Sequence, residues 1–368
     1  MVDTQLRPIG SAPPRWRRPI PSILSGLVTL FLLAAAPASA QETITELNFG
    51  SPSGEGSDTA RTLHTLVKVQ GTGGLNQDGL YLITQIGDRS TICAAENQTS
   101  IDTPWRAQTW RYCSQFTTHA GGATLMGRNW DNQNVGSIIV SLNQPPEGYA
   151  SVSFSRAIDL GFPLNLDLEQ IKESELGSRL LLAPFYATDG INERGLAIAI
   201  AGVGETKHAA TADSTLIFVT YLVRKILDQA ATVDEAIAVA EHYVPFDLDK
   251  NSLNSHFLVA DALGRSAVME YTDHWEISRG EGEWQIMTNK AVAGVTESEL
   301  KDQCWRFTSI SDALERSAGR VNWGAGLRIL RDAAQQGTTW SVAYGLSSED
   351  IYFTVYQHWD IVYHLSPF

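Results

Sequence analysis

Residues 113–131 read CSQFTTHAGGATLMGRNWD. A glycine pair separates two runs there, a pattern typical of two strands joined by a turn. The segment begins with Cys113, one of only three cysteines among 368 residues, and ends with Arg128 and Asp131. A cysteine acts as a nucleophile only as a thiolate, which needs a base or a positive neighbour. This segment is therefore the first candidate for a reactive site.

The base for such a thiol is not obvious from the neighbouring residues. Of the eight histidines only His119 is close to Cys113 in sequence, and six extended residues span about 20 Å. If the chain is cut before Cys113, however, the new α-amino group has a reference pKa of about 7.7–8.0 and lies on the same residue as the thiol. Such a residue supplies both nucleophile and base, and it then needs an anion to orient the amine and donors for an oxyanion.

Further motifs follow Cys113 in order: NERGL (192–196), HFLVADALGRSAVMEY (256–271), TN (288–289), WRF (305–307) and TTWSVAYGLSSEDIYF (338–353). Together with CSQF and GRNWD they resemble the cysteine N-terminal-nucleophile hydrolases. More narrowly, they are similar to the linear amide C–N hydrolases: choloylglycine hydrolase, penicillin V acylase, the acid ceramidase group and the isopenicillin N acyltransferase group. The resemblance covers 113–368 and implies an α+β fold of four αββα layers.

The resemblance also implies roles for five residues. Cys113 matches the nucleophile, Asp131 the carboxylate that orients the α-amino group, and Arg128 the arginine beside the thiol. In physical terms Asp131 favours the protonated amine and Arg128 favours the thiolate. Asn289 matches the oxyanion asparagine, and Arg306 matches a helical arginine near the nucleophile. The structural alternatives are a strand-end salt bridge, a turn asparagine and an exposed helical arginine.

Residues 1–40 differ in composition from the rest. Arg15, Arg17 and Arg18 precede an apolar run, 23–36, which is followed by the small residues PASA. This is the pattern of a secretory signal peptide, and the run is shorter than the roughly 20 apolar residues of a membrane span. We predict cleavage before Gln41 and export to the periplasm or the extracellular space. A retained N-terminal anchor is the alternative.

Seventy-two residues then separate Gln41 from Cys113, so signal peptidase cannot expose this cysteine. The arrangement resembles the ceramidase and acyltransferase groups, in which a propeptide is removed by self-cleavage. We therefore predict a cut between Tyr112 and Cys113, a propeptide or small N-terminal subunit at 41–112, and a catalytic αββα domain at 113–368.

The hydrophobic pattern indicates where the elements lie. Strands at 66–69 and 80–86 are expected to form a hairpin, and further strands are expected at 137–142, 150–155 and 284–289. Another strand should follow a turn at 192–195, and two should flank a turn at 262–264. Two or three more are expected within 340–366. Helices are expected at 214–230, 232–244, 297–317 and 323–336. Strands, then helices, then strands indicate sheets covered by helix pairs.

Charge and cysteine usage limit the partners. Removing residues 1–40 takes away four arginines and one aspartate and changes the net charge from −14 to −17, which disfavours nucleic acid and anionic membranes. No other segment is long and apolar enough to span a bilayer. Neither a C-x-x-C pair nor an H-E-x-x-H motif occurs, so we expect no metal and no cofactor. A Cys93–Cys304 disulfide and a homo-oligomer are both left open.

We therefore predict hydrolysis of a linear amide, R–CO–NH–R′, in a small N-acyl compound through an acyl-enzyme on Cys113. The alternatives are an acyltransferase with an amine acceptor and a non-catalytic secreted binding protein on the same fold. Within the family, the resemblance is weakest to the bile-salt hydrolases. Bile-salt hydrolases carry a second side-chain donor about ten residues beyond their NExGL motif, where this chain has Ala201–Val203 with only backbone N–H groups.

Overall fold

The computed structural model describes residues 43–47, 62–69, 79–86, 112–132, 136–164, 167–168, 177–207, 214–247 and 252–368. The chain divides into two compact units, Met1–Gln41 and Glu42–Phe368, and every described residue belongs to the second. The predicted signal peptide and Cys93 lie outside the described residues. Within the described ranges, no helix has both the length and the apolar character needed to cross a membrane.

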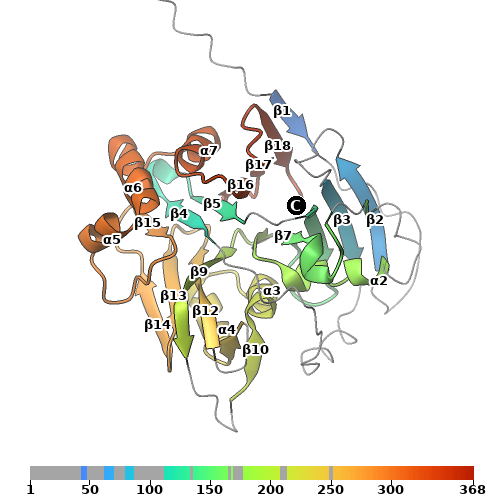
Figure 1. The fold of residues 1–368 in the computed structure, drawn as a ribbon, viewed down its shortest axis with the longest axis horizontal. Coiled ribbons are helices and arrows are strands. Elements are labelled where there is room, and N and C mark those ends of the chain that lie inside the picture. Colours follow the sequence, from blue (N-terminus) through green and yellow to red (C-terminus); the bar gives the residue numbers. More distant parts are fainter. Residues whose placement is uncertain are drawn as a thin grey trace, which may run out of the picture. The chain divides into compact units, whose positions relative to one another are not determined.

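Two large sheets form the framework of the second unit (Figure 1). The first sheet has the order β1 (Thr43–Glu46), β18 (Ile361–Leu365), β17 (Ile351–Val355), β16 (Thr338–Gly345), β5 (Leu125–Asp131), β4 (Ser114–Thr118), β15 (Trp284–Met287). The second sheet has the order β14 (Trp275–Arg279), β13 (Ser266–Tyr271), β12 (Ser252–Ala260), β9 (Ala197–Lys207), β8 (Asp189–Asn192), β7 (Ser151–Arg156), β6 (Ile138–Gln144), β3 (Leu80–Ile86), β2 (Thr62–Val69).

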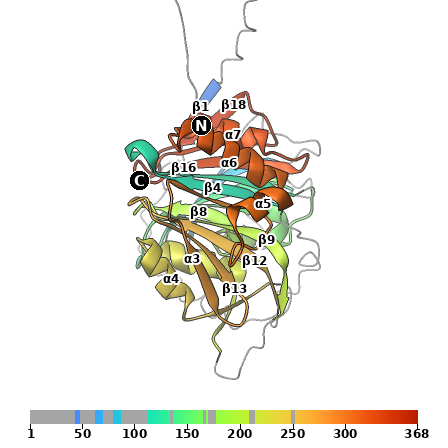
Figure 2. The ribbon, with the colours of Figure 1, turned by 90° about the vertical axis from the view of Figure 1, so that its left-hand side faces the viewer.

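Helices cover the outer face of each sheet. On the first sheet, α6 (Trp305–Ser317) contacts β4 and β15, α7 (Trp323–Asp332) contacts β5 and β16, and α5 (Glu297–Gln303) packs on α6. On the second sheet, α3 (Val219–Gln229) contacts β8 and β9, and α4 (Val233–Ala240) contacts β12 and β13. Figure 2 shows the resulting order of layers, helices over sheet over sheet over helices. The predicted four-layer αββα fold is confirmed.

Aromatic side chains fill the space between the sheets. Trp130 of β5 stacks on Trp340 of β16 with ring centroids 5.1 Å apart. From the second sheet, Phe154 stacks on Trp340 at 5.9 Å and meets Tyr344 edge-on at 6.4 Å. All four rings are fully buried, so they join the two sheets into one core.

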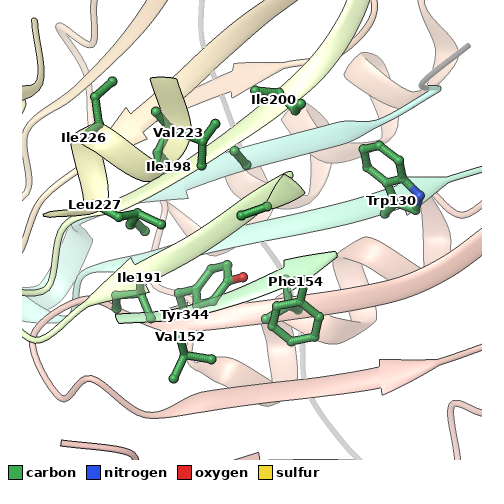
Figure 3. Packing of buried hydrophobic residues seen from close by; sticks show 14 of the residues in the cluster. Trp130, Val152, Phe154, Ile191, Ile198, Ile200, Val223, Ile226, Leu227 and Tyr344 are labelled. Carbon is green, nitrogen blue, oxygen red and sulfur yellow. The ribbon is translucent and has the colours of Figure 1, made fainter. Parts of the chain in front are cut away.

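The other face of the second sheet is covered by α3. Val223, Ile226 and Leu227 of this helix are fully buried and belong to the same core as Ile191 and Ile198 of the strands below (Figure 3). Residues at i, i+3 and i+4 line one side of a helix, which is why the apolar spacing predicted this segment as helical.

Residues ahead of Cys113 add strands to both sheets. β2 and β3 form the predicted hairpin, and β3 also pairs in parallel with β6, so that Leu80 lies opposite Ile138. At the far edge of the first sheet, β1 pairs in parallel with β18. The described strands of the segment between the predicted signal peptide and Cys113 are thus part of the framework, while the role of this segment as propeptide or small subunit stays a prediction.

Three predicted helices are shorter than expected. The helix predicted at 232–244 is α4, which ends at Ala240. The segment 214–230 begins with the strand β10 (Leu216–Phe218), which pairs in parallel with β11 (Val244–Phe246), and becomes helical only at Val219. The last predicted helix ends at Asp332 instead of 336, because the chain turns there and the backbone N–H of Gln335 donates to Oγ1 of Thr338 at 2.8 Å.

The predicted helix 297–317 is two helices, α5 and α6. They meet at Cys304, whose backbone is extended with φ −147° and ψ 106°. The break turns α6 so that Arg306, in its first turn, is buried. Cys304 is a free thiol, and the Cys93–Cys304 pairing that the sequence left open stays open because Cys93 lies outside the described residues.

The motif NERGL is a turn that ties a strand to a helix. Oδ1 of Asn192 accepts from the backbone N–H groups of Arg194 and Leu196, while its Nδ2 donates to two carbonyls at the end of α3. Gly195 has φ +71°, and a Cβ there would lie 2.0 Å from the carbonyl oxygen of Leu346, so only glycine fits. Asn192 is therefore structural, as predicted.

Candidate active site

Cys113 lies directly before β4, in the middle of the molecule. Because β4 pairs antiparallel with β5, with Ser114 opposite Asn129, the cysteine stands beside the end of the strand that carries Arg128 and Asp131. The backbone N–H of Tyr112 donates to the carbonyl oxygen of Asp131 at 3.2 Å and continues this pairing past the Tyr112–Cys113 bond. Cys113 is fully buried, whereas Tyr112 is 53% exposed.

Arg128 approaches the thiol from the space between the sheets. Its Nη2 lies 3.7 Å from Sγ of Cys113 and donates to the carbonyl oxygen of Ile200 at 2.8 Å. Its Nη1 forms an ion pair with Asp189 on β8, and its guanidinium lies over the ring of Trp130 at 4.7 Å. Arg128 and Asp189 are both fully buried, so a charge pair joins the sheets next to the candidate nucleophile.

Asp131 lies on the other face of the first sheet, under the helices. Its Oδ1 accepts from Oγ1 of Thr338 at 2.6 Å, and its Oδ2 accepts from Nε2 of Gln335 at 2.9 Å. Nη1 of Arg306 is 3.5 Å from the same Oδ2. Arg128 and Asp131 therefore have different charged partners, and the alternative of a simple salt bridge between them is wrong.

Arg306 connects the cysteine to the candidate oxyanion donor. Its Nη1 donates to the carbonyl oxygen of Cys113 at 2.6 Å, and its Nη2 donates to Oδ1 of Asn289 at 2.5 Å. Nδ2 of Asn289 in turn donates to the carbonyl oxygen of Gly202 at 2.6 Å. Arg306 is 5% exposed, so the alternative of an exposed helical arginine is also wrong.

Burial dominates the electrostatics of this cluster in the uncut chain. Desolvation raises the pKa of the Cys113 thiol, and the nearby charge of Arg128 opposes this only in part. Desolvation likewise raises the pKa of Asp131 against the hydrogen bonds from Thr338 and Gln335, and the pKa of Asp189 against the charge of Arg128. A thiol with a raised pKa is mostly protonated at neutral pH, so Cys113 must lose its proton before it can attack.

The structure thus brings the five predicted residues together from β4, β5, α6 and the segment after β15, and their catalytic roles remain predictions. His119 stands at the opposite end of β4, about 20 Å from Cys113 at the rise of a strand, so it cannot serve as the base. Trp130, Phe185 and Tyr186 are at most 5% exposed and belong to the core.

Three residues of the cluster were not foreseen: Asp189, Gln335 and Thr338. Thr338 opens a motif quoted above, but nothing in the local pattern marks it as a partner of a carboxylate 207 residues earlier. Asp189 stands three residues before NERGL, and the only sequence signal that could have identified it was a polar residue within a buried strand.

Within the described ranges, no group of three or more His, Cys, Asp or Glu side chains is placed to hold a metal ion.

Two facing sheets, helices on both outer faces and a buried cysteine at the start of an inner strand, next to arginine and aspartate, define the class of the N-terminal-nucleophile hydrolases. The sequence match is narrower. The family model of the linear amide C–N hydrolases, choloylglycine hydrolase family, matches residues 113–309, more than half of the chain. The chain belongs to this family, and the match begins at Cys113.

Individual relatives are more distant. The chain is 31% identical over 111 residues to penicillin V acylase of Pectobacterium atrosepticum, a match that spans 28% of this chain and 30% of the relative. Penicillin V acylase from Agrobacterium tumefaciens is similar in structure, with 17% identity, a TM-score of 0.46 and coverage of 66% of this chain and 83% of the other. A mutant of conjugated bile acid hydrolase from Clostridium perfringens is also similar in structure, with 13% identity, a TM-score of 0.47 and coverage of 69% of this chain and 92% of the other.

Proposed function

We propose that this protein hydrolyses a linear amide of an N-acyl compound through an acyl-enzyme on Cys113, after the chain has been cut between Tyr112 and Cys113. One observation carries the proposal. Cys113, whose thiol lies beside the buried guanidinium of Arg128, stands where the family match begins, and its backbone carbonyl accepts a hydrogen bond from the arginine that also holds Asn289. Nucleophile, orienting carboxylate and oxyanion donor are then within one hydrogen-bonded cluster.

The reaction follows from these positions. The α-amino group of Cys113 takes the thiol proton, and Sγ attacks the carbonyl carbon of the substrate amide. The oxyanion accepts a hydrogen bond from Nδ2 of Asn289. The ammonium returns the proton to the leaving amine, the C–N bond breaks, and an acyl thioester remains. Water then attacks the thioester, which releases the carboxylic acid and restores the thiol.

The free α-amino group requires a prior cleavage, for which we propose self-processing. The thiol of Cys113 gives up its proton as Sγ attacks the carbonyl carbon of Tyr112. The peptide C–N bond then breaks, its nitrogen takes up a proton and becomes the α-amino group, and the Tyr112 acyl group is transferred to sulfur. Water hydrolyses this thioester, which leaves a carboxylate on Tyr112 and the amine on Cys113. The 72 residues between Gln41 and Cys113 support this step, because signal cleavage alone cannot expose the cysteine.

The substrate class is proposed from the site and from the relatives. One relative is named for its action on penicillin V, and penicillin V is an N-acyl amide with an apolar acyl group. The donor that bile-salt hydrolases carry beyond their NExGL motif is replaced here by Gly202, whose backbone carbonyl contacts Asn289. We therefore propose an amide with an apolar acyl group, such as phenoxyacetyl or fatty acyl, in preference to a conjugated bile salt.

A panel assay tests the proposal. Purified cleaved protein is incubated with penicillin V, N-palmitoylethanolamide and glycocholate, and the released amine is quantified by mass spectrometry. We expect release from one of the first two that is abolished in Cys113→Ala. The matched variant Cys304→Ser, which keeps a polar group at the start of α6, should stay within threefold of wild type. No Cys113-dependent amine release from any of the three would overturn the proposal.

A further inference from the structure

The segment that carries Asn289 has little backbone support of its own. β15 is the edge strand of the first sheet and ends at Met287, and residues 288–293 follow without strand pairing. Asn289 is half-buried, and the two residues after it are exposed. An oxyanion donor must be held in place before the reaction, because its value lies in avoiding reorganisation. The contacts that fix this segment therefore come from elsewhere.

They come from a histidine and a glutamate on the second sheet. His256 of β12 and Glu270 of β13 lie directly next to the ladder pair Phe257 and Met269, and Nδ1 of His256 is 2.9 Å from Oε1 of Glu270. Nε2 of His256 is 2.7 Å from the carbonyl oxygen of Thr288. The carboxylate of Glu270 accepts from the backbone N–H of Val292 at 3.0 Å and of Ala293 at 2.7 Å. Both ends of the segment 288–293 are thus bound to the same pair.

The geometry also indicates the charges of His256 and Glu270. The carbonyl oxygen of Thr288 can only accept, and Glu270 already accepts from two backbone N–H groups, so both ring nitrogens of His256 are placed to donate. Burial alone would raise the pKa of Glu270, but the hydrogen bond and charge of His256 outweigh it and hold this pKa below its usual range. His256 is fully buried and Glu270 is 8% exposed. A buried charged pair of this kind is a weak source of stability, which indicates that the pair serves to position the segment 288–293.

The pair lies close to the anchor of the Asn289 amide. In the ladder of β9 and β12, Ala201 lies opposite His256 and Gly202 opposite Ser255. Nδ2 of Asn289 donates to Gly202, so the side chain of Asn289 and the backbone on either side of it are bound to neighbouring strands of the second sheet. Cys113 belongs to the first sheet, so these contacts set the position of Asn289 across the space between the two sheets.

We propose that His256 and Glu270 are positioning residues that fix the segment 288–293, and through it the amide of Asn289, at the distance from Cys113 that the reaction requires. The inference rests on the proposed function, in which Asn289 is the oxyanion donor. It predicts that loss of the pair lowers turnover without removing any group that touches the substrate.

The first test is kinetic. Glu270→Gln keeps the shape of the side chain, and His256→Gln keeps one donor. The substrate is penicillin V or N-palmitoylethanolamide, whichever the wild type hydrolyses. Each variant should lose about 10- to 100-fold in kcat, while KM stays within about threefold. This loss is smaller than the roughly 10²- to 10³-fold that is typical for removal of an oxyanion donor. His364→Gln is the matched control. Both ring nitrogens of His364 are also within hydrogen-bond distance of oxygen atoms, of Glu46 at 2.7 Å and of Asp350 at 2.9 Å, but this histidine lies near the opposite edge of the first sheet. It should stay within twofold of wild type.

A double-mutant cycle separates positioning from a general structural effect. If the pair acts only through Asn289, adding Glu270→Gln to Asn289→Ala should change kcat by less than threefold. Losses that multiply in the double variant would overturn the inference, and so would a Glu270→Gln single variant with wild-type kcat.

Hydrogen exchange tests the same contacts without a substrate. In Glu270→Gln, the backbone amides of Val292 and Ala293 should exchange faster by at least tenfold, while peptides from β16 and β17 stay unchanged. If wild type hydrolyses none of the three amides, the proposed function fails, and the exchange measurement still decides whether the pair holds the segment. Unchanged exchange at Val292 and Ala293 would overturn the inference.

Discussion

Arg128 and Asp131 stand three residues apart on β5 and point to opposite faces of the first sheet. Successive side chains of a strand alternate between faces, so an odd spacing separates them. Arg128 reaches into the space between the sheets and pairs with Asp189, whereas Asp131 lies under the helices with Thr338, Gln335 and Arg306. The thiol of Cys113 is thus approached by a positive charge from one side, while its backbone is held from the other.

This separation means that the two charged clusters can be altered independently. Asp189 is fully enclosed and contacts Arg128 away from the thiol, so loss of Asp189 should appear mainly in stability. The cluster with Asp131 is bonded through Arg306 to the backbone of Cys113, so its changes should appear mainly in turnover.

Cleavage of the chain is the first prediction. Because Cys113 must acquire a free α-amino group, wild-type protein purified after export should yield a fragment whose N-terminal sequence starts at Cys113. Cys113→Ala should remain a single chain that starts near Gln41, since the attacking thiol is gone. Intact mass and N-terminal sequencing decide the outcome. A cut in Cys113→Ala would indicate an external protease, and an uncut, fully active wild type would contradict the mechanism.

Asp131→Asn should lower kcat by about 10²-fold, the usual size of an orienting or acid–base contribution. The amide can still accept from Gln335 and can turn its NH₂ toward the hydroxyl of Thr338, so the fold should persist, as checked by circular dichroism. Asp234→Asn makes the same chemical change in an exposed carboxylate and should leave kcat within twofold. Activity within threefold of wild type in Asp131→Asn would show that this carboxylate is structural.

Asp189→Asn should destabilise the protein by about 3–5 kcal/mol, because it leaves Arg128 buried without its counter-charge. Adding Arg128→Met should restore part of that loss, since the buried charge is then gone. The double variant should be inactive if Arg128 supports the thiolate, because it lacks the guanidinium beside Cys113. Urea unfolding followed by tryptophan fluorescence gives the free energies. A double variant that is less stable than Asp189→Asn alone would contradict a buried ion pair as the cause.

Glu270 should contribute stability that depends on pH. Its pKa in the folded chain lies below the roughly 4.3 of an unfolded glutamate, so its ionised form stabilises the fold above that pH, and this contribution is lost as the pH falls through the folded-state pKa. The difference in free energy of unfolding between wild type and Glu270→Gln should be largest at pH 7 and shrink below pH 4. Urea titrations at both pH values measure it, with the exposed Glu241→Gln as a control that should differ by less than about 0.5 kcal/mol. A difference that grows toward acid pH would contradict the assigned ion pair.

Much of the framework could be predicted because it depends on neighbours along the chain. Alternating and helical spacings indicated the strands of the hairpin at 66–86, the strands near the C-terminus and the helix α4. Thr232 accepts from the backbone N–H of Glu235 as its sequence position predicts. The boundary misjudged at Leu216–Phe218 is a place where pairing with a strand further along the chain, Val244–Phe246, overrides the local helical preference.

The sequence by itself determined the order of the motifs, the family and the five candidate residues, since these are properties of residue type and spacing. Tertiary structure alone decided that Asp189 neutralises Arg128, that Thr338 and Gln335 hold Asp131, and that His256 and Glu270 bind the segment of Asn289. These contacts join residues up to 207 positions apart and, in two of the three cases, cross between the sheets. A buried polar group must find a partner wherever packing places one, and no pattern along the chain records which partner that is.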